Sequence, residues 1–257
     1  FGVDAVRHYV LSEMAQDNDG LISWEAIIEK TNAELANVLG NLVSRTIAMS
    51  NKYFGGIVED KGVTEDVDAD LKQVVTSAYG KVKSAVEDYK ISDAISEALA
   101  VFRRANKYVD ETAPWVLAKD PAKADRLKTV LYNLSESIVI GLSLMTPFIP
   151  KSCEKALNLI EYGKYVSGTK VTDKPEILFA RLDAKVVMEE VNKMLEARRP
   201  KEEKKVEVVK EEKVAKPQIE FDDFAKVELK VARITACEKV AKSKKLLNCA
   251  YTLRITL

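Results

Sequence analysis

Two polar residues on one predicted helix have the types and the spacing to recognise an unpaired nucleobase. Asn41 and Arg45 are four residues apart, so their side chains emerge one helical turn from each other. The asparagine amide offers a donor and an acceptor, and the arginine guanidinium offers a rigid fork of donors. Such a pair can bind the Watson–Crick edge of a base splayed out of a single-stranded loop. The alternative is a surface amide beside one member of an exposed ion pair.

A tryptophan at a helix end could supply a stacking surface for such a base. Trp115 follows Pro114, and the residue before a proline avoids helical angles, so a helix is expected to end there. Stacking of an unpaired base on an aromatic side chain contributes about 1–3 kcal/mol. A tryptophan taken alone is more often a packing residue, and we assign Trp24, at another predicted helix start, to that role.

Two groups of basic residues could contact RNA phosphates. The first lies near the residues named above and consists of Lys52, Arg103, Arg104 and Lys107. The second lies in a loop expected between two strands and consists of Lys239, Lys242, Lys244 and Lys245. Binding by the second group would be salt-sensitive and independent of sequence. Either group could instead be solvated surface charge, because 40 basic residues balance 40 acidic ones and no global field attracts a polyanion.

Metal and membrane sites are not indicated. The cysteines, Cys153, Cys237 and Cys249, form no CxxC pair, and the single histidine, His8, adds too few ligands for zinc. We expect reduced thiols of a cytoplasmic protein and a structural role for His8. The longest apolar stretch, residues 138–145, is interrupted by serine and glycine and is too short to span a membrane. A chain beginning with phenylalanine is expected to be a fragment.

Apolar residues at helical spacing predict a helical bundle that would carry these side chains. The predicted helices cover residues 3–14, 24–53, 65–86, 122–145, 151–160 and 183–198, with another that begins near 92, runs through 105 and is ended or kinked at Pro114. Ser23 and Thr64 are expected as N-caps, and Gly55 is expected to end the second helix. One face of that helix gathers apolar residues that should point into the bundle: Leu35, Leu39, Leu42, Met49 and Tyr53, together with Thr46.

Composition divides the chain into parts. We expect a helix and turn over residues 1–22, the bundle over 23–162, an extension packing on it over 163–198, a mixed-charge linker over 199–217 and a partial β-barrel over 218–257. In the last part Val227, Leu229 and Val231 alternate with charged residues, and residues 246–257 are expected to pair with them. Because two strands do not make a stable barrel, this part is expected to be incomplete and poorly ordered alone.

Two stretches carry a family resemblance. The first runs from Asn32 to Arg45 and continues at residues 51–54, and the second runs from Ala105 to Trp115 and continues at residues 118–119. Together they resemble the anticodon-binding helical domain of the methionyl-tRNA synthetase family. Related synthetases for valine, isoleucine and leucine share a looser form of the first stretch, whereas the Pro-Trp pair in the second is more specific. Residues 1–7 resemble the segment that follows the family's catalytic KMSKS loop.

A third stretch resembles a different module. Residues 221–231 and 242–247 are similar to the opening of the OB-fold tRNA-binding module that many bacterial members carry at their C-terminus. From Asn248 onward the resemblance fades. In that family the complete module also mediates dimerisation, so the resemblance implies a homodimer for a protein that carries it whole. The implied fold is therefore mainly α, with a helical anticodon-binding bundle, a charged linker and an incomplete OB-fold segment.

The resemblance also implies roles. Trp115 would stack on the first anticodon base, a cytosine, while Asn41 and Arg45 would read its edge, so the partner would be tRNA(Met). The whole protein would be a methionine–tRNA ligase that uses methionine and ATP with Mg. Neither a HIGH nor a KMSKS string occurs here, so we expect no catalytic residue, no cofactor and no methionine-dependent pyrophosphate exchange by this chain. The alternatives are the anticodon domain of another class I synthetase, a free-standing tRNA-binding cofactor protein and a purely structural bundle.

Overall fold

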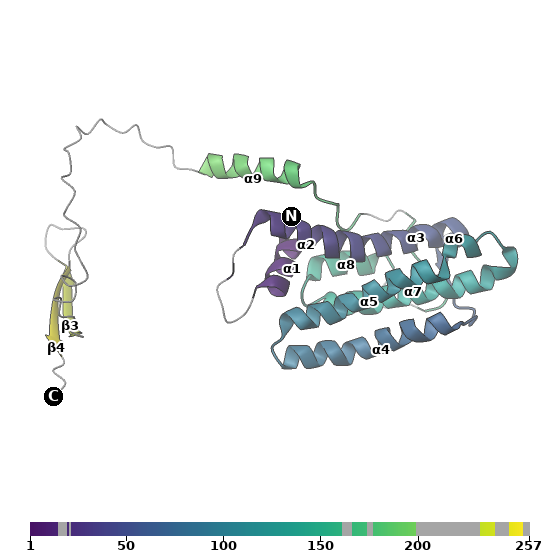
Figure 1. Cartoon of the computed structure of the whole chain (residues 1–257), viewed down its shortest axis with the longest axis horizontal. Helices are drawn as coiled ribbons and strands as arrows, with labels where there is room; N and C mark the ends of the chain where they lie inside the picture. The colour runs from purple at the N-terminus through teal and green to yellow at the C-terminus, as the bar shows by residue number, and fades with distance from the viewer. Residues whose placement is uncertain are drawn as a thin grey trace, which may run out of the picture. The chain divides into compact units, whose positions relative to one another are not determined.

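The fold was analysed in a computed structural model that describes residues 1–14, 20, 22–160, 166–173, 177–198, 232–239 and 247–253. Two compact units, residues 1–200 and 201–257, divide the chain, and each is described by itself. In the first unit the long helices lie side by side as a bundle (Figure 1), which confirms the mainly helical prediction.

Short connections join most of the helices of the first unit. Its α-helices are α1 (Val3–Glu13), α2 (Trp24–Lys30), α3 (Asn41–Phe54), α4 (Asp66–Glu87), α5 (Ile91–Thr112), α6 (Pro114–Leu117), α7 (Ala124–Met145), α8 (Pro150–Asn158) and α9 (Ala184–Arg198). A π-helix, η1 (Thr31–Gly40), joins α2 to α3, and a 3₁₀-helix, η2 (Pro121–Lys123), precedes α7. The short strands β1 (Ile57–Val58) and β2 (Thr169–Lys170) pair antiparallel.

The helical segment from α2 to α3 begins and ends where the sequence predicts. The backbone N–H of Ala26 donates to the Ser23 hydroxyl over 3.1 Å, and Gly55 ends the segment with a φ of 59°. The π-helical middle is a difference from the prediction. Buried Leu35 and Leu39 are spaced four residues apart, a spacing that keeps both side chains on the core side of an α-helix or a π-helix alike. The spacing of apolar residues therefore cannot distinguish the π-helix from an α-helix.

The start of α4 corrects one predicted cap. Glu65, not Thr64, is the N-cap residue of this helix, and it forms a capping box with Asp68. The backbone N–H of Glu65 donates to Asp68 Oδ2 over 2.6 Å. The box satisfies an exposed N–H at each end of the first turn, an advantage that a threonine one residue earlier would not gain.

Helices α5 and α7 approach each other closely in the core. Phe102 of α5 is fully buried, and its ring faces Gly141 of α7. A Cβ built on Gly141 would lie 2.7 Å from the nearest ring atom of Phe102. The missing side chain thus lets the two helices approach closely, because any larger residue would overlap the ring.

Two glycine substitutions are expected to change stability in opposite directions. Gly80 lies on the exposed face of α4 with nothing within 4 Å of an added Cβ, so Gly80→Ala should raise the free energy of unfolding by about 0.5–1 kcal/mol. Gly141→Ala should lower it, because the added methyl overlaps Phe102. Urea denaturation followed by circular dichroism measures both, and a shift of the same sign in the two variants would contradict the packing described here.

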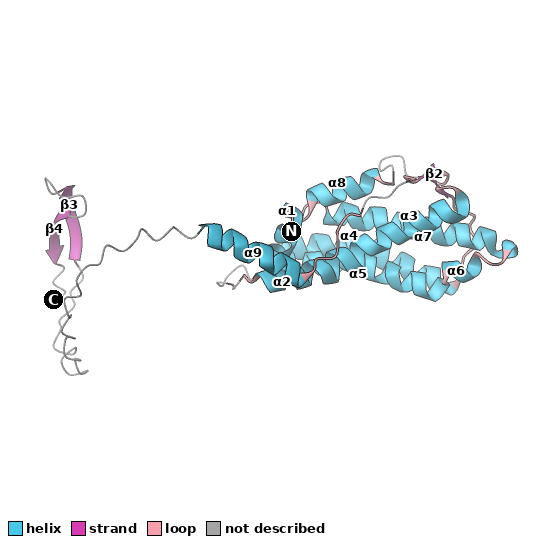
Figure 2. Cartoon of the chain, turned by 90° about the horizontal axis from the view of Figure 1, so that it is seen from above, coloured by secondary structure: helices cyan, strands magenta, loops and turns pink. Residues whose placement is uncertain are grey.

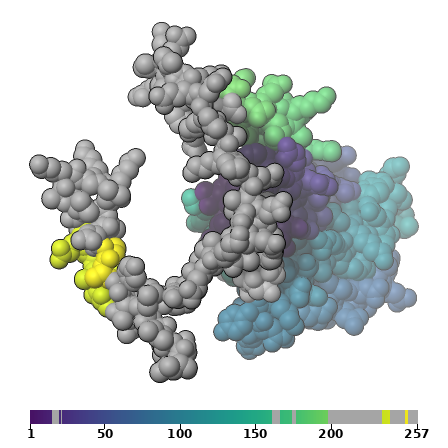
Figure 3. Space-filling view, turned by 60° about the vertical axis from the view of Figure 1, so that its left-hand side comes forward, coloured from purple at the N-terminus to yellow at the C-terminus, as the bar shows by residue number. Residues whose placement is uncertain are grey.

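Residues 177–198 run back along the bundle. The Asn32 side chain bonds the backbone of Leu182 in both directions, donating to its carbonyl over 2.8 Å and accepting from its N–H over 2.7 Å. Phe179 lies against Gly40 at the end of η1. Beyond this, α9 contacts α2, and Figure 3 shows its green surface beside the purple N-terminal helices. The expected extended piece over 176–181 has no regular structure in its described part, residues 177–181.

The second unit contains an antiparallel hairpin. Strand β3 (Ala232–Lys239) pairs with β4 (Leu247–Leu253), with a bulge between Ile234 and Ala236. The predicted partner for the last strand, residues 227–231, lies outside the described residues, and the pairing strand begins at Ala232 instead. Cys237 and Cys249 face each other in this register, with their sulfur atoms 2.9 Å apart as free thiols.

Candidate nucleic-acid interface

The end of α5 lies beside η1, and the two helices run in the same direction. The Arg103 guanidinium donates to Glu34 over 3.0 Å, and the Asn106 amide donates to the Val38 carbonyl over 2.9 Å. The second contact lies further along the chain than the first in both α5 and η1, so the two helices are parallel. At about 1.5 Å per residue, Asn41 and Arg45 fall level with the last turn of α5. Figure 1 and Figure 2 both show α6, which carries Trp115, at the end of the bundle toward which α3 and α5 run.

The two polar side chains on α3 have unused hydrogen-bonding groups. Asn41 is exposed and Arg45 is half-buried. Within the described part of the chain, neither side chain has a hydrogen-bond or ion-pair partner, so their donors and acceptors are available to a ligand. The predicted apolar face beside them is observed, since Leu42 and Thr46 are buried and Met49 and Tyr53 are partly buried.

Trp115 is held by a sharp turn between two helices. Helix α5 ends at Thr112, and Ala113 adopts a left-handed conformation with a φ of 41°. Pro114 is buried as the first residue of α6, which leaves Trp115 43 % exposed. A left-handed backbone is uncommon for a residue other than glycine and costs about 1–2 kcal/mol. Such positions cluster at functional sites, where the surrounding structure maintains them.

The basic residues predicted to contact phosphates differ in their solvent exposure and in their ion-pair partners. Lys52 is exposed, with its Nζ 5.3 Å from the centre of the Tyr53 ring, and the Lys107 side chain is 71 % exposed, 3.5 Å from Glu111. Arg103 bonds Glu34 from a half-exposed position. Arg104 is only 12 % exposed and donates to Glu111 over 2.8 Å, so it has little surface to offer a phosphate.

The basic group of the second unit lies almost wholly outside the structural description. Lys239 is the last residue of β3, and only its backbone is described. Lys242, Lys244 and Lys245 lie outside the described residues. Their expected contacts with RNA therefore stay a prediction.

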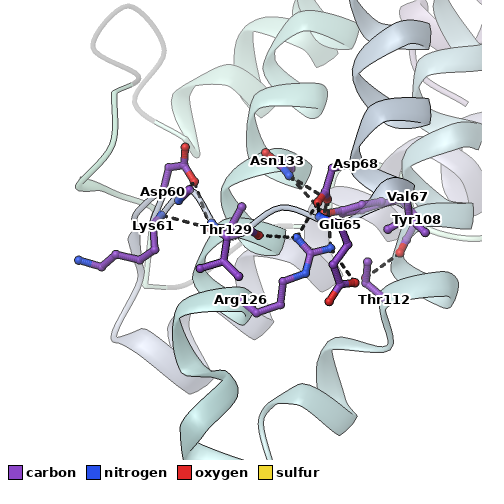
Figure 4. A network of polar contacts seen from close by, with 12 residues as sticks. Asp60, Lys61, Glu65, Val67, Asp68, Tyr108, Thr112, Arg126, Thr129 and Asn133 are labelled. Atoms are coloured by element: carbon purple, nitrogen blue, oxygen red, sulfur yellow. Dashed lines mark hydrogen bonds and ion pairs between the residues drawn. The ribbon is translucent and has the colours of Figure 1, made fainter.

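A buried polar cluster fixes the C-terminal half of α5 (Figure 4). Asp68 is 8 % exposed and accepts from Arg126 Nη1 over 2.8 Å and Nη2 over 3.1 Å. The Tyr108 hydroxyl also donates to Asp68, and the Asn133 amide contacts both, over 3.3 Å to Asp68 and 3.2 Å to Tyr108. The cluster joins α4, α5 and α7 only two turns before Trp115, so it holds in place the helix that carries the turn at Ala113.

The cluster contains one carboxylate that stays ionised. Burial alone would raise the pKa of Asp68, but hydrogen bonds from Arg126 and Tyr108 lower it by more, so the pKa lies below its usual range. Burial and the bond to Asp68 raise the pKa of Tyr108, so the phenol keeps its proton and remains a donor. A paired and fully hydrogen-bonded charge is the form in which a carboxylate tolerates a core.

A second group of charges surrounds Glu34 in η1. His8 is fully buried with Nε2 2.8 Å from Glu34, and Lys30 and Arg103 lie 3.2 and 3.0 Å from the same carboxylate. Burial would raise the pKa of Glu34, but the bond to His8 and the charge of Lys30 lower it by more. These contacts tie α1 and α5 to η1. The structural role predicted for His8 agrees with this geometry.

Trp24 has the packing role that the sequence suggests. Its ring stacks on Phe1, with ring centres 5.8 Å apart and planes inclined by 14°. Among the described residues, no helix is long and apolar enough to cross a bilayer, and no three histidine, cysteine or acidic side chains gather as metal ligands would.

Comparison with known families identifies the class. The model described as "Anticodon-binding domain of tRNA ligase" matches residues 68–245, and the one described as "tRNA synthetases class I (M)" matches residues 1–47. The first match covers more than half of the chain. The chain therefore belongs to the family of tRNA-ligase anticodon-binding domains.

Individual relatives narrow this class. The chain is 41 % identical to the methionine–tRNA ligase of Clostridium perfringens over 264 residues, which cover 98 % of the chain and 40 % of that protein. It is 37 % identical to the enzyme of Bacillus subtilis over 268 residues, again 98 % and 40 %. The chain thus corresponds to the C-terminal portion of methionyl-tRNA synthetase that contains the anticodon-binding domain. It spans about two fifths of the length of these relatives.

Solved structures of methionyl-tRNA synthetase resemble the fold of this chain. The apo form of Mycobacterium tuberculosis methionyl-tRNA synthetase superposes with a TM-score of 0.67 at 31 % identity, covering 71 % of this chain and 39 % of that one. The same enzyme bound by methionyl-adenylate superposes with a TM-score of 0.66 at 31 % identity, covering 70 % and 38 %.

Proposed function

We propose that the chain reads the anticodon of tRNA(Met) through Asn41, Arg45 and Trp115, as part of an ATP-dependent methionine–tRNA ligase. The observation that carries this proposal is the parallel alignment of α5 with η1. It brings two unpartnered polar side chains and a half-exposed indole to one end of the bundle. The similarity to methionine–tRNA ligases supports the choice of tRNA.

Each of the three residues has a separate task in the proposal. Trp115 stacks on the first anticodon base, because a ring on a short helix beyond a rigid turn offers a fixed flat surface. Asn41 supplies a donor and an acceptor to the edge of that cytosine, and Arg45 adds donors from one turn further along α3. Reading the edge and the face of one base together excludes a base with a different donor pattern.

Phosphates of the loop would meet the exposed cations nearby. We propose Lys52 and Lys107 for this contact, because both ammonium groups reach solvent, with Arg103 joining once RNA competes for it with Glu34. Arg104 is not included, because its guanidinium is nearly buried and already bonded. Contacts of this kind position the RNA and carry no sequence information.

The remaining parts of the proposal concern the rest of the protein. We assign the bundle to residues 23–162, its extension to 163–198, the linker to 199–217 and the opening of an OB-fold tRNA-binding module to 218–257, which a complete protein would use for dimerisation. ATP with Mg and methionine would be bound by a catalytic part outside this chain, so the chain alone is expected to be inactive. The proposed location is the cytoplasm.

Binding of two RNA hairpins tests the proposed function. An anticodon stem–loop bearing CAU and a matched one with the cytosine changed to uracil are titrated with the 257-residue chain and followed by anisotropy. Because the site is built around one base, the CAU loop should bind about 5- to 150-fold more tightly, the worth of about 1–3 kcal/mol of base discrimination. Equal affinity for the two loops would reject anticodon reading and leave a basic helical bundle.

A further inference from the structure

The directions of Asn41 and Arg45 depend on where η1 ends. In a π-helix each backbone N–H bonds the carbonyl five residues earlier, so each residue turns the chain by less than in an α-helix. The N–H of Asn41 makes such a bond, to the carbonyl of Ala36, and the α-helix starts at the same residue. Moving this boundary by one residue would rotate all of α3 about its axis, together with both base-reading side chains.

The π-helix needs contacts from outside to persist. Such helices are usually single-turn bulges, often at functional sites, whereas η1 has 10 residues. Its first half is held by Asn32, which bonds the backbone of Leu182 in both directions. Glu34 follows, with bonds to His8 and Arg103. These contacts lie seven or more residues before Asn41, so they do not fix the end of η1.

Near that end Phe179 packs against Gly40, and a different residue bonds the backbone. Asn106 of α5 donates from Nδ2 to the carbonyl of Val38 over 2.9 Å, and the same nitrogen donates to the carbonyl of Phe102 over 2.9 Å. The amide is therefore anchored on its own helix while it bonds η1. Val38 lies three residues before Asn41, inside the last turn of the π-helix.

We propose that Asn106 is a positioning residue for anticodon discrimination. Its amide fixes the end of η1, and the end of η1 sets the direction in which Asn41 and Arg45 point. The inference rests on the proposed function of those two residues. Asn106 itself does not contact the RNA. It acts through its bond to the backbone of Val38, which sets the rotation of α3 about its own axis.

The test compares two asparagine variants of the full chain. Asn106→Leu removes the donor while keeping the number and branching of the side-chain heavy atoms, and Asn32→Leu removes the comparable amide at the other end of η1. Each variant is titrated with the CAU hairpin and the changed hairpin, and its unfolding is measured in urea. In Asn106→Leu the ratio of the two affinities should fall about tenfold, through loss of CAU affinity alone, which is the worth of one misplaced base contact. In Asn32→Leu the ratio should stay that of the unchanged chain.

The outcomes separate this inference from the function on which it rests. If the unchanged chain binds both hairpins equally, the proposed function fails first, and the inference falls with it. If the unchanged chain discriminates and Asn106→Leu keeps its ratio, only the role of Asn106 is rejected. A uniform loss of affinity for both hairpins would also reject it, because that is the result of a merely structural residue. If Asn106→Leu does not fold, Asn106→Ala replaces it. This variant has a smaller side chain, and the ratio of the two affinities is expected to fall by the same factor.

Discussion

Replacing Asp68 by alanine is expected to lower the free energy of unfolding by about 3–5 kcal/mol, the usual cost of removing one member of a buried ion pair. Arg126 is only 4 % exposed, and the change would leave its guanidinium with one carboxylate, that of the exposed Glu65 at 3.4 Å. It would also remove the acceptor of the Tyr108 hydroxyl and half of the capping box of α4. Urea or thermal denaturation of the purified chain measures the loss.

Asp66 provides the matched control. It lies in the same first turn of α4 but is exposed, so Asp66→Ala removes only a favourable interaction with the helix dipole, about 0.3–1 kcal/mol. If the two variants lost the same stability, the buried cluster in Figure 4 would not be the reason for the effect of Asp68.

Acid should erase the difference between the unchanged chain and Asp68→Ala. The pKa of Asp68 is lower in the folded protein than its unfolded value of about 4, so its stabilisation is present above that value. It is then lost as the pH falls through the folded pKa. The two unfolding free energies should therefore converge below about pH 4, whereas a constant gap down to pH 2 would show that the carboxylate charge contributes nothing.

Trp115→Ala is expected to weaken binding of the CAU hairpin by roughly 5- to 150-fold, which corresponds to about 1–3 kcal/mol for the loss of one stacked base. The indole is 43 % exposed, so its removal should cost the fold little. Anisotropy of a labelled hairpin gives the affinity, and circular dichroism confirms that the variant is folded.

Trp24 makes the control for this variant, because it is exposed to a similar extent, 40 %, but stacks on Phe1. Trp24→Phe should keep the affinity of the unchanged chain. In that variant Trp115 is the only tryptophan, so RNA binding should still quench its fluorescence. Binding without quenching would remove Trp115 from the proposed contact.

Local signals in the sequence predicted where the helical segment from α2 to α3 begins and ends. Ser23 and Gly55 act through their own backbone and its nearest neighbours, so their effect can be read without knowing the tertiary structure. The same locality explains the error at Thr64. Threonine and glutamate both precede α4, and the choice of Glu65 depends on the side chain of Asp68 three residues later.

Features that depend on distant partners were not predictable from the pattern. The sequence assigns Asp68 to the acidic first turn of a helix, whereas its bonding partners come from α5 and α7. Tyr108 and Arg126 fall in line with the apolar faces of their helices, and this was the available signal, because buried polar groups must find partners. The π-helix and the partner of β4 likewise follow from contacts, not from the period of apolar residues.

In the candidate site, too, some features could be predicted from the sequence and others depend on tertiary contacts. The residue types at positions 41, 45 and 115 indicate base recognition before any fold is known. That they share one end of the bundle follows from the contacts of Arg103 and Asn106 with η1, which no spacing in the chain reveals. For the same reason Arg103 and Arg104 look alike in sequence, although one reaches solvent and the other is nearly buried.

The Asp68 cluster also sets an order of events during synthesis. Its bonds span 40 residues to Tyr108, 58 to Arg126 and 65 to Asn133. A growing chain emerges from the ribosome at about 5–20 residues per second, so the carboxylate waits several seconds for its last partner. Until α7 emerges, α4 can pack on α5 alone, and the part of its surface that α7 covers stays open to chaperones. The base-reading surface is therefore among the last parts of the bundle to become rigid, only after α7 has left the exit tunnel.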